Sequence, residues 1–142
     1  MARRKAKRRS ERERLTLAVR AAAIVVRREE PTEFSRLIGS PGRTNIRIEG
    51  RAVSATGRPD RETLVLVYRQ NSLTKNLGYA LGGTTPWTVS ADLPADQFAD
   101  LMALVLADKL HSTEMCFDKI KWHKGTLLSI DFGTLPIPSE RE

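Results

Sequence analysis

The sequence predicts an α+β domain, in which a mostly antiparallel sheet of about five strands packs on one long amphipathic helix. Three observations lead to this prediction: strict alternation at residues 87–93, helical periodicity at 94–109, and two pairs of strand-like segments. One or two further helices are expected near the N-terminus. At 142 residues the chain fits a single domain that can bury a core without disulfides or metals. We therefore expect a basic arm at 1–10, one domain at 11–135 and a C-terminal tail at 136–142.

The central strand and helix follow one another directly. Apolar residues alternate with polar ones in the strand segment, which is the period of a half-buried strand: Trp87, Val89, Ala91 and Leu93. Pro94 suits the first turn of a helix, where its missing N–H costs nothing. The helix from Pro94 to about Lys109 carries an apolar stripe at helical spacing: Phe98, Leu101, Met102 and Val105.

A β-hairpin is expected after this helix, with strands at 114–122 and 126–132. A two-residue loop at Lys124-Gly125 mixes apolar and polar residues on both faces, whereas a three-residue loop with Gly125 in the left-handed position sorts them better. The second register predicts one core face: Cys116, Ile120, Trp122, Leu128, Ile130 and Phe132. The opposite face then carries Phe117, Lys119, Lys121, Leu127, Ser129 and Asp131.

A helix is also expected from Ser10 or Glu11 to Pro31. Ser10 and Glu13 have the spacing of a capping box. Four apolar residues lie at helical spacing: Leu15, Val19, Ala22 and Val26. The alternative is a strand from Ala22 to Arg27, because β-branched residues are frequent there.

The segment between Pro31 and the central strand is expected to hold a short helix, a hairpin and a long loop. Thr32 caps the helix, which bears Phe34, Leu37 and Ile38. The hairpin joins Ile46–Val53, where Gly50 is expected to mark a bulge, to an interior strand at Thr63–Gln70. Residues 71–85 contain three glycines and are expected to form the loop.

The positive charge is concentrated at the N-terminus. Residues 1–30 contain eleven Lys and Arg against four Glu, whereas residues 31–142 contain thirteen basic and thirteen acidic residues. The like charges in such a run repel one another, so an acidic partner would explain their presence. Nucleic-acid phosphates are partners of this kind, because binding them releases counterions. We expect a small non-enzymatic nucleic-acid-binding protein, contacting DNA or RNA phosphates. The expected contact residues are Arg3, Arg4, Lys5, Lys7, Arg8, Arg9, Arg12 and Arg14.

Two further sets of residues could add to such a surface. The aromatic residues that could stack on bases are few, and the tryptophans are better explained as core: Tyr68, Tyr79, Trp87 and Trp122. Charged residues that alternate along strands could form a basic sheet face: Arg47, Arg51, Arg69, Lys119 and Lys121. The alternative function is a protein-binding module, either an assembly subunit or an inhibitor of a larger complex, whose arm binds an acidic protein surface.

Other functional classes find little support. His111, Glu114, Cys116 and His123 lack the spacing of a zinc site, and Cys116 is expected to be a buried, inert thiol. The irregular glycines of 71–85 do not form a phosphate-binding loop, and no nucleophile has a local signature. We expect no enzyme activity, cofactor, metal or membrane partner, and a soluble cytoplasmic location, because Arg20 interrupts the apolar segment that would otherwise resemble a signal peptide.

Overall fold

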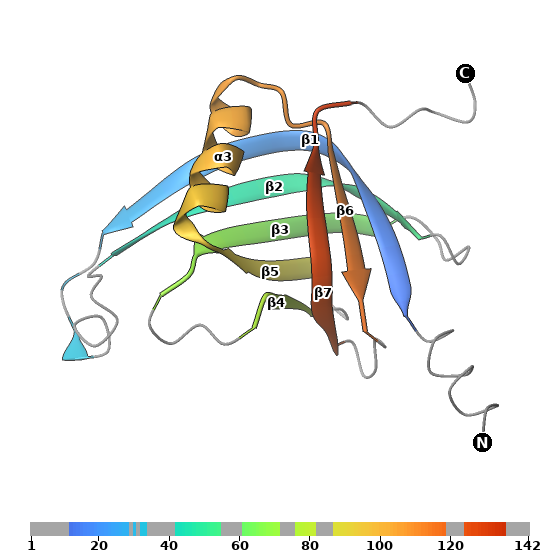
Figure 1. The fold of residues 1–142 in the computed structure, drawn as a ribbon, viewed down its shortest axis with the longest axis horizontal. Coiled ribbons are helices and arrows are strands. Elements are labelled where there is room, and N and C mark those ends of the chain that lie inside the picture. The colour runs from blue at the N-terminus through green and yellow to red at the C-terminus, as the bar shows by residue number, and fades with distance from the viewer. Residues whose placement is uncertain are drawn as a thin grey trace.

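The computed structural model describes residues 12–28, 30, 32–33, 42–54, 61–71, 76–81, 87–118 and 124–135. Seven strands and one complete helix lie in these ranges (Figure 1). Their order is β1 (Glu13–Arg28), β2 (Gly42–Ser54), β3 (Arg61–Arg69), β4 (Gly78–Leu81), β5 (Trp87–Leu93), α3 (Ala95–Leu106), β6 (Ser112–Phe117) and β7 (Lys124–Gly133).

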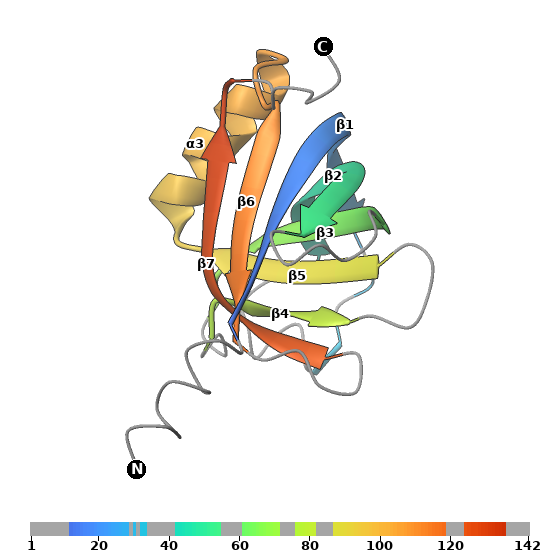
Figure 2. The same ribbon diagram turned by 90° about the vertical axis from the view of Figure 1, so that its right-hand side faces the viewer.

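The strands form a closed barrel in the order β1-β2-β3-β5-β4-β7-β6. Every pairing is antiparallel except that of β3 with β5, and the pairing of β6 with Glu13–Ala18 of β1 closes the barrel. In Figures 1 and 2, β1, β2, β3 and β5 curve across one side, while β6 and β7 cross them on the other. Closure removes the free edges that an open sheet of this size would leave along most of its length.

The barrel interior is filled by the inward-facing residues of each strand. On β3, Val65 and Val67 are fully buried, as the predicted interior strand requires. On β5 the alternation of buried and half-buried residues matches the prediction along its whole length. The largest fully buried side chains are Phe117, Leu17, Ile46, Ile48, Leu101 and Met115.

Helix α3 lies across the inner face of the β1-β2-β3-β5 side, beside β6 and β7 (Figures 1 and 2). Pro94 takes the N-cap position, and Phe98 and Leu101 are buried against the barrel. The helix ends in a Schellman motif, in which the Lys109 N–H bonds the Leu104 carbonyl at 2.9 Å and the Asp108 N–H bonds Val105 at 3.1 Å. Asp108 occupies the left-handed position of this motif, at φ 56°, where glycine is usual. The helix predicted from Pro94 is therefore present, although it covers only twelve residues.

The α+β fold class is wrong: the domain is a seven-stranded closed barrel with a short helix, not a five-stranded sheet packed on a long one. The predicted N-terminal helix is also wrong, because Glu13–Arg28 is strand β1. A bulge between Val19 and Ala21 explains the misleading periodicity. The inward positions are odd before the bulge and even after it, so Leu15, Val19 and Ala22 face inward at a helix-like spacing, and Val26 continues this spacing where β1 is already exposed.

Gly50 lies opposite this bulge. A Cβ on Gly50 would overlap the Ala18 carbonyl oxygen of β1 and approach its carbonyl carbon at 2.9 Å. The predicted bulge therefore belongs to the partner strand, and Gly50 permits the two backbones to approach each other there.

The C-terminal hairpin is present, and its predicted core face is correct for Ile130 and Phe132, which pack partly buried against the core, but wrong for Cys116 and Leu128. Met115 pairs with Ile130 and Phe117 with Leu127, and a second bulge lies between Cys116 and Phe117. Thr113, Met115 and Phe117 face the interior, so Cys116 lies on the outer face and is half-buried rather than a core thiol. Residues 119–123, which include Trp122 and the predicted turn residue His123, lie outside the described residues.

The three remaining fold predictions have different outcomes. The β2–β3 hairpin is confirmed, with Ile46 opposite Val67. The predicted loop at 71–85 contains strand β4, which joins β5 to β7. The helix expected from Thr32 falls mainly on residues 34–38, outside the described part of the chain.

Replacing Gly50 with alanine should destabilise the fold by about 1–3 kcal/mol, because a rigid backbone atom of β1 blocks the new methyl group. Gly133→Ala is the matched control, since its methyl group would meet only the Ser112 side chain, which can rotate. Urea unfolding of both variants measures the difference, and an equal loss in the two would contradict the close approach at Gly50.

Candidate nucleic-acid interface

Five strands, β1, β2, β3, β5 and β6, each have one end at the barrel end where β1 begins, called here the N-terminal end. Strand register places the start of β1 beside the end of β6, because Glu13 pairs with Phe117. The end of β2 and the starts of β3 and β5 lie there too, since Leu15 pairs with Ser54 and Thr63 with Trp87. Figure 2 shows β1 and β6 meeting at this end. The basic N-terminal segment therefore joins the barrel at a defined position.

Arg12 and Arg14 are the predicted contact residues that lie within the described chain. Arg12 is exposed immediately before β1. Arg14 is exposed on the outer face and forms an ion pair with Glu114 of β6, with Nη1 at 3.3 Å from Oε1. The other six predicted contact residues, at positions 3–9, lie outside the described residues. The structure thus brings Arg12 and Arg14 to one barrel end, and a carboxylate accompanies one of them.

Arg61 and Trp87 form a feature of this end that the sequence did not reveal. The Arg61 guanidinium lies over the indole of Trp87, with Cζ at 5.3 Å from the ring centroid, in a cation–π contact. Trp87 is only 5% exposed and also packs against Phe117, at a centroid distance of 5.9 Å. This contact depends on the parallel pairing of β3 with β5, which no sequence pattern indicates. An exposed arginine is thereby held at the rim of the barrel by a buried aromatic side chain.

Arg47 of the predicted basic sheet face is matched by a carboxylate, and so is Arg20 of β1, whereas Lys119 and Lys121 lie outside the described residues. Arg20 donates two hydrogen bonds to Glu62, at 2.8 and 3.2 Å, and Arg47 donates one to Glu49 at 2.9 Å. The hydrogen bond from Arg20 lowers the pKa of the Glu62 carboxyl, and the positive charge of Arg51 adds to this shift. The outer face of β1, β2 and β3 is therefore a network of ion pairs rather than an unopposed cationic surface.

The aromatic candidates for base stacking are dispersed. Tyr79 on β4 is 52% exposed and Tyr68 on β3 is half-buried, whereas Trp87 belongs to the core as predicted. Trp122 lies outside the described residues. The described chain therefore offers single aromatic side chains and not a stacking platform, which favours contacts to phosphate over contacts to bases.

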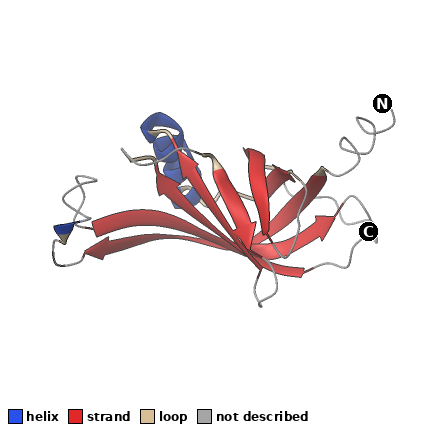
Figure 3. Ribbon diagram, turned by 90° about the horizontal axis from the view of Figure 1, so that it is seen from below, coloured by secondary structure: helices blue, strands red, loops and turns tan. Residues whose placement is uncertain are grey.

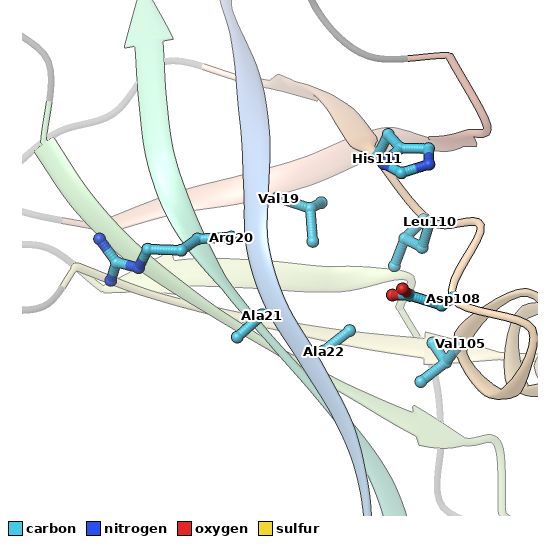
Figure 4. Close-up of a pocket in the computed structure, with 8 residues that line it drawn as sticks. All are labelled: Val19, Arg20, Ala21, Ala22, Val105, Asp108, Leu110 and His111. Atoms are coloured by element: carbon cyan, nitrogen blue, oxygen red, sulfur yellow. The ribbon is translucent and has the colours of Figure 1, made fainter.

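A hollow of about 200 Å³ separates β1 from the segment that follows α3 (Figure 4). Its lining residues are Val19, Arg20, Ala21, Ala22, Val105, Asp108, Leu110 and His111. Figure 4 shows the Asp108 carboxylate directed toward β1, while the Arg20 side chain extends away on the other side of the strand. The hollow is smaller than a usual small-molecule site, and its lining combines aliphatic side chains with Asp108 and His111.

Within the described residues, the structure contains no cluster of metal-ligating side chains. None of its described helices has the length and apolar character needed to cross a membrane. Comparisons of the chain with family models, curated proteins and solved structures gave no match.

Glu62→Gln should lower the thermal midpoint slightly at neutral pH, because the folded-state pKa of Glu62 is depressed by its bond to Arg20. A depressed carboxyl pKa stabilises the fold at pH values above the unfolded-state pKa, and this stabilisation is lost as the pH falls through the folded-state pKa. The difference between wild type and variant should therefore shrink in acid. A difference that grows as the pH falls would contradict the assignment.

Proposed function

We propose that this protein is a small, non-enzymatic nucleic-acid-binding protein that holds its ligand chiefly by contacts to phosphates. The observation that carries the proposal is the charge contrast along the chain. Positions 1–10 bear six basic residues and no acidic ones, whereas residues 31–142 are neutral overall. The pairing of Arg20 with Glu62 and of Arg47 with Glu49 leaves the N-terminal segment as the main unopposed source of positive charge.

The N-terminal end of the barrel supports this proposal by extending the basic segment onto the folded domain. Arg12 continues the charge run to the first strand, and Arg61 adds an exposed guanidinium that Trp87 orients. Phosphates that neutralise such charges release counterions, which gives affinity without base readout. Arg14 would exchange its carboxylate partner Glu114 for a phosphate and therefore contribute less.

The competing function is a protein-binding module whose basic segment binds an acidic protein surface. Both partners would give salt-sensitive binding, since both rest on charge. They differ in what they require of the ligand: the phosphate proposal predicts binding to any sequence of DNA or RNA, and the protein proposal predicts none. Titration with DNA and RNA therefore separates the two functions.

Fluorescence-anisotropy titrations with unrelated DNA and RNA oligonucleotides at several salt concentrations test the proposal. If most of the six arm charges each meet a phosphate, log K should fall with log salt at a slope of about −4 to −5. A threefold to fourfold rise in salt would then weaken binding by roughly two to three orders of magnitude. Deleting residues 2–9 should flatten the slope and reduce affinity for all sequences alike.

Matched variants locate the interface on the barrel. Arg12→Ala and Arg61→Ala should each weaken binding, and each should reduce the salt slope by roughly 0.7–0.9. Arg69→Ala is the control, because Arg69 is also exposed but lies at the opposite end of β3 from Arg61.

An arm in which every arginine is changed to lysine keeps the charge and should retain the slope. Absence of salt-sensitive binding to DNA and to RNA would refute the proposed function and favour an acidic protein partner.

A further inference from the structure

Among the described strands, only β2 lies beside the second half of β1. β6 pairs with β1 as far as Ala18, and the last backbone bond on that side joins the Val19 N–H to the His111 carbonyl at 3.0 Å. From Ala21 to Arg28, β1 pairs with β2 alone among the described strands. Figures 1 and 3 show β1 and β2 projecting together beyond the rest of the barrel. The barrel is thus closed at one end of β1 and leaves an edge of this strand open at the other.

The open edge has the composition of a pairing strand. Val26 is 76% exposed and Val25 is 39% exposed, and both are β-branched. Residues 21–26 contain neither a proline nor a charge, which are the usual devices that protect an edge from other strands. Exposed edges of this kind form backbone hydrogen bonds with an added strand. The edge therefore offers both backbone groups and apolar side chains to a partner.

Charge at the two ends of the edge indicates which partner fits. Asp108 faces β1 from the far side of the hollow that Ala22 lines. Arg28 is exposed at the other end of the edge, six residues farther along the strand. Six residues of strand span about 20 Å, so Asp108 and Arg28 of one chain cannot meet. An antiparallel strand carrying the same sequence would bring its own Arg28 to Ala22, and hence to Asp108.

We propose that two copies of this chain associate through antiparallel pairing of their β1 edges about a two-fold axis. The pairing places Val25 opposite Val25 of the second copy, Ile24 opposite Val26, and Ala22 opposite Arg28. Residues directly opposite each other on two antiparallel strands point to the same face of the sheet. The two members of each residue pair named above do lie on the same face of β1. Arg28 of each copy then lies at the hollow and pairs with Asp108 of the other. The two ion pairs fix the register that the small apolar residues alone would leave free to slip.

This association is independent of nucleic-acid binding and is tested by the oligomeric state of the full chain. Sedimentation equilibrium should show a monomer–dimer equilibrium in wild type. Val25→Lys places two like charges opposite each other at the axis and should raise the dimer dissociation constant at least about tenfold. Val53→Lys is the control: Val53 is similarly exposed, at 45%, but lies on β2, away from the open edge, and its replacement should leave the constant unchanged.

A charge exchange tests the register itself. Arg28→Glu and Asp108→Lys should each weaken the dimer between about twofold and thirtyfold, because each removes two symmetry-related exposed ion pairs. The double variant restores opposite charges at the same sites and should recover the wild-type constant. Thermal unfolding of each variant at concentrations where it is monomeric confirms that the fold is intact. A wild type that stays monomeric, a dimer insensitive to Val25→Lys, or a double variant no better than the single ones would overturn the proposal.

Discussion

The fold depends on the unequal use of the two edges of β1: β2 pairs along one edge for most of the strand, whereas β6 pairs along only the first half of the other. The first half of β1 hydrogen-bonds β6 and closes the barrel, while the second half leaves β6 and continues with β2 alone. The bulge between Val19 and Ala21 makes this change possible, because it moves the inward face from odd to even positions and lets Ala22 and Ile24 pack toward the interior. Gly50 on β2 accommodates the bulge where a side chain would collide with Ala18.

The core and the helix follow from this closure. Leu15 and Leu17 of β1 and Met115 and Phe117 of β6 are buried because the two strands meet. Where β6 diverges, α3 takes its place over β1, and Val105 and Leu110 line the hollow that remains between them. The Schellman motif at Asp108 turns the chain from the helix back toward β6. Closure, helix position and the open edge are therefore consequences of a single divergence along β1.

The sequence predicted the elements whose periodicity was uninterrupted. β5, α3 and the β2–β3 hairpin were recognised because each carries an unbroken apolar pattern. β1 was not recognised, because its bulge converts strand alternation into helix-like spacing. The face of β6 was reversed for the same physical reason, since a bulge follows Cys116. β4 has only four residues, too few for a periodic signal.

The residues of the candidate interface were likewise predicted only in part. The sequence identified the basic segment and placed Arg12 and Arg14 at its end, and both are exposed where β1 begins. It did not identify Arg61, because the contact of Arg61 with Trp87 requires two parallel strands that are not consecutive in the chain. It also could not indicate that Arg20 of β1 is matched by Glu62 of β3, since this ion pair reaches across β2 and depends on strand order and register. The six residues at positions 3–9 lie outside the described chain and stay a prediction.

Amide hydrogen exchange resolved by NMR along β1 tests the central claim most directly, because it reports which backbone groups are paired on each edge. In dilute protein, Leu15–Ala18 should be protected throughout, since these residues pair on both sides. Residues Ala22–Arg28 should be protected only at positions that bond β2, and the other positions should gain protection as the protein concentration rises. Uniform protection of residues 13–28 in dilute protein, with the short amide–amide contacts of a helix, would contradict the account.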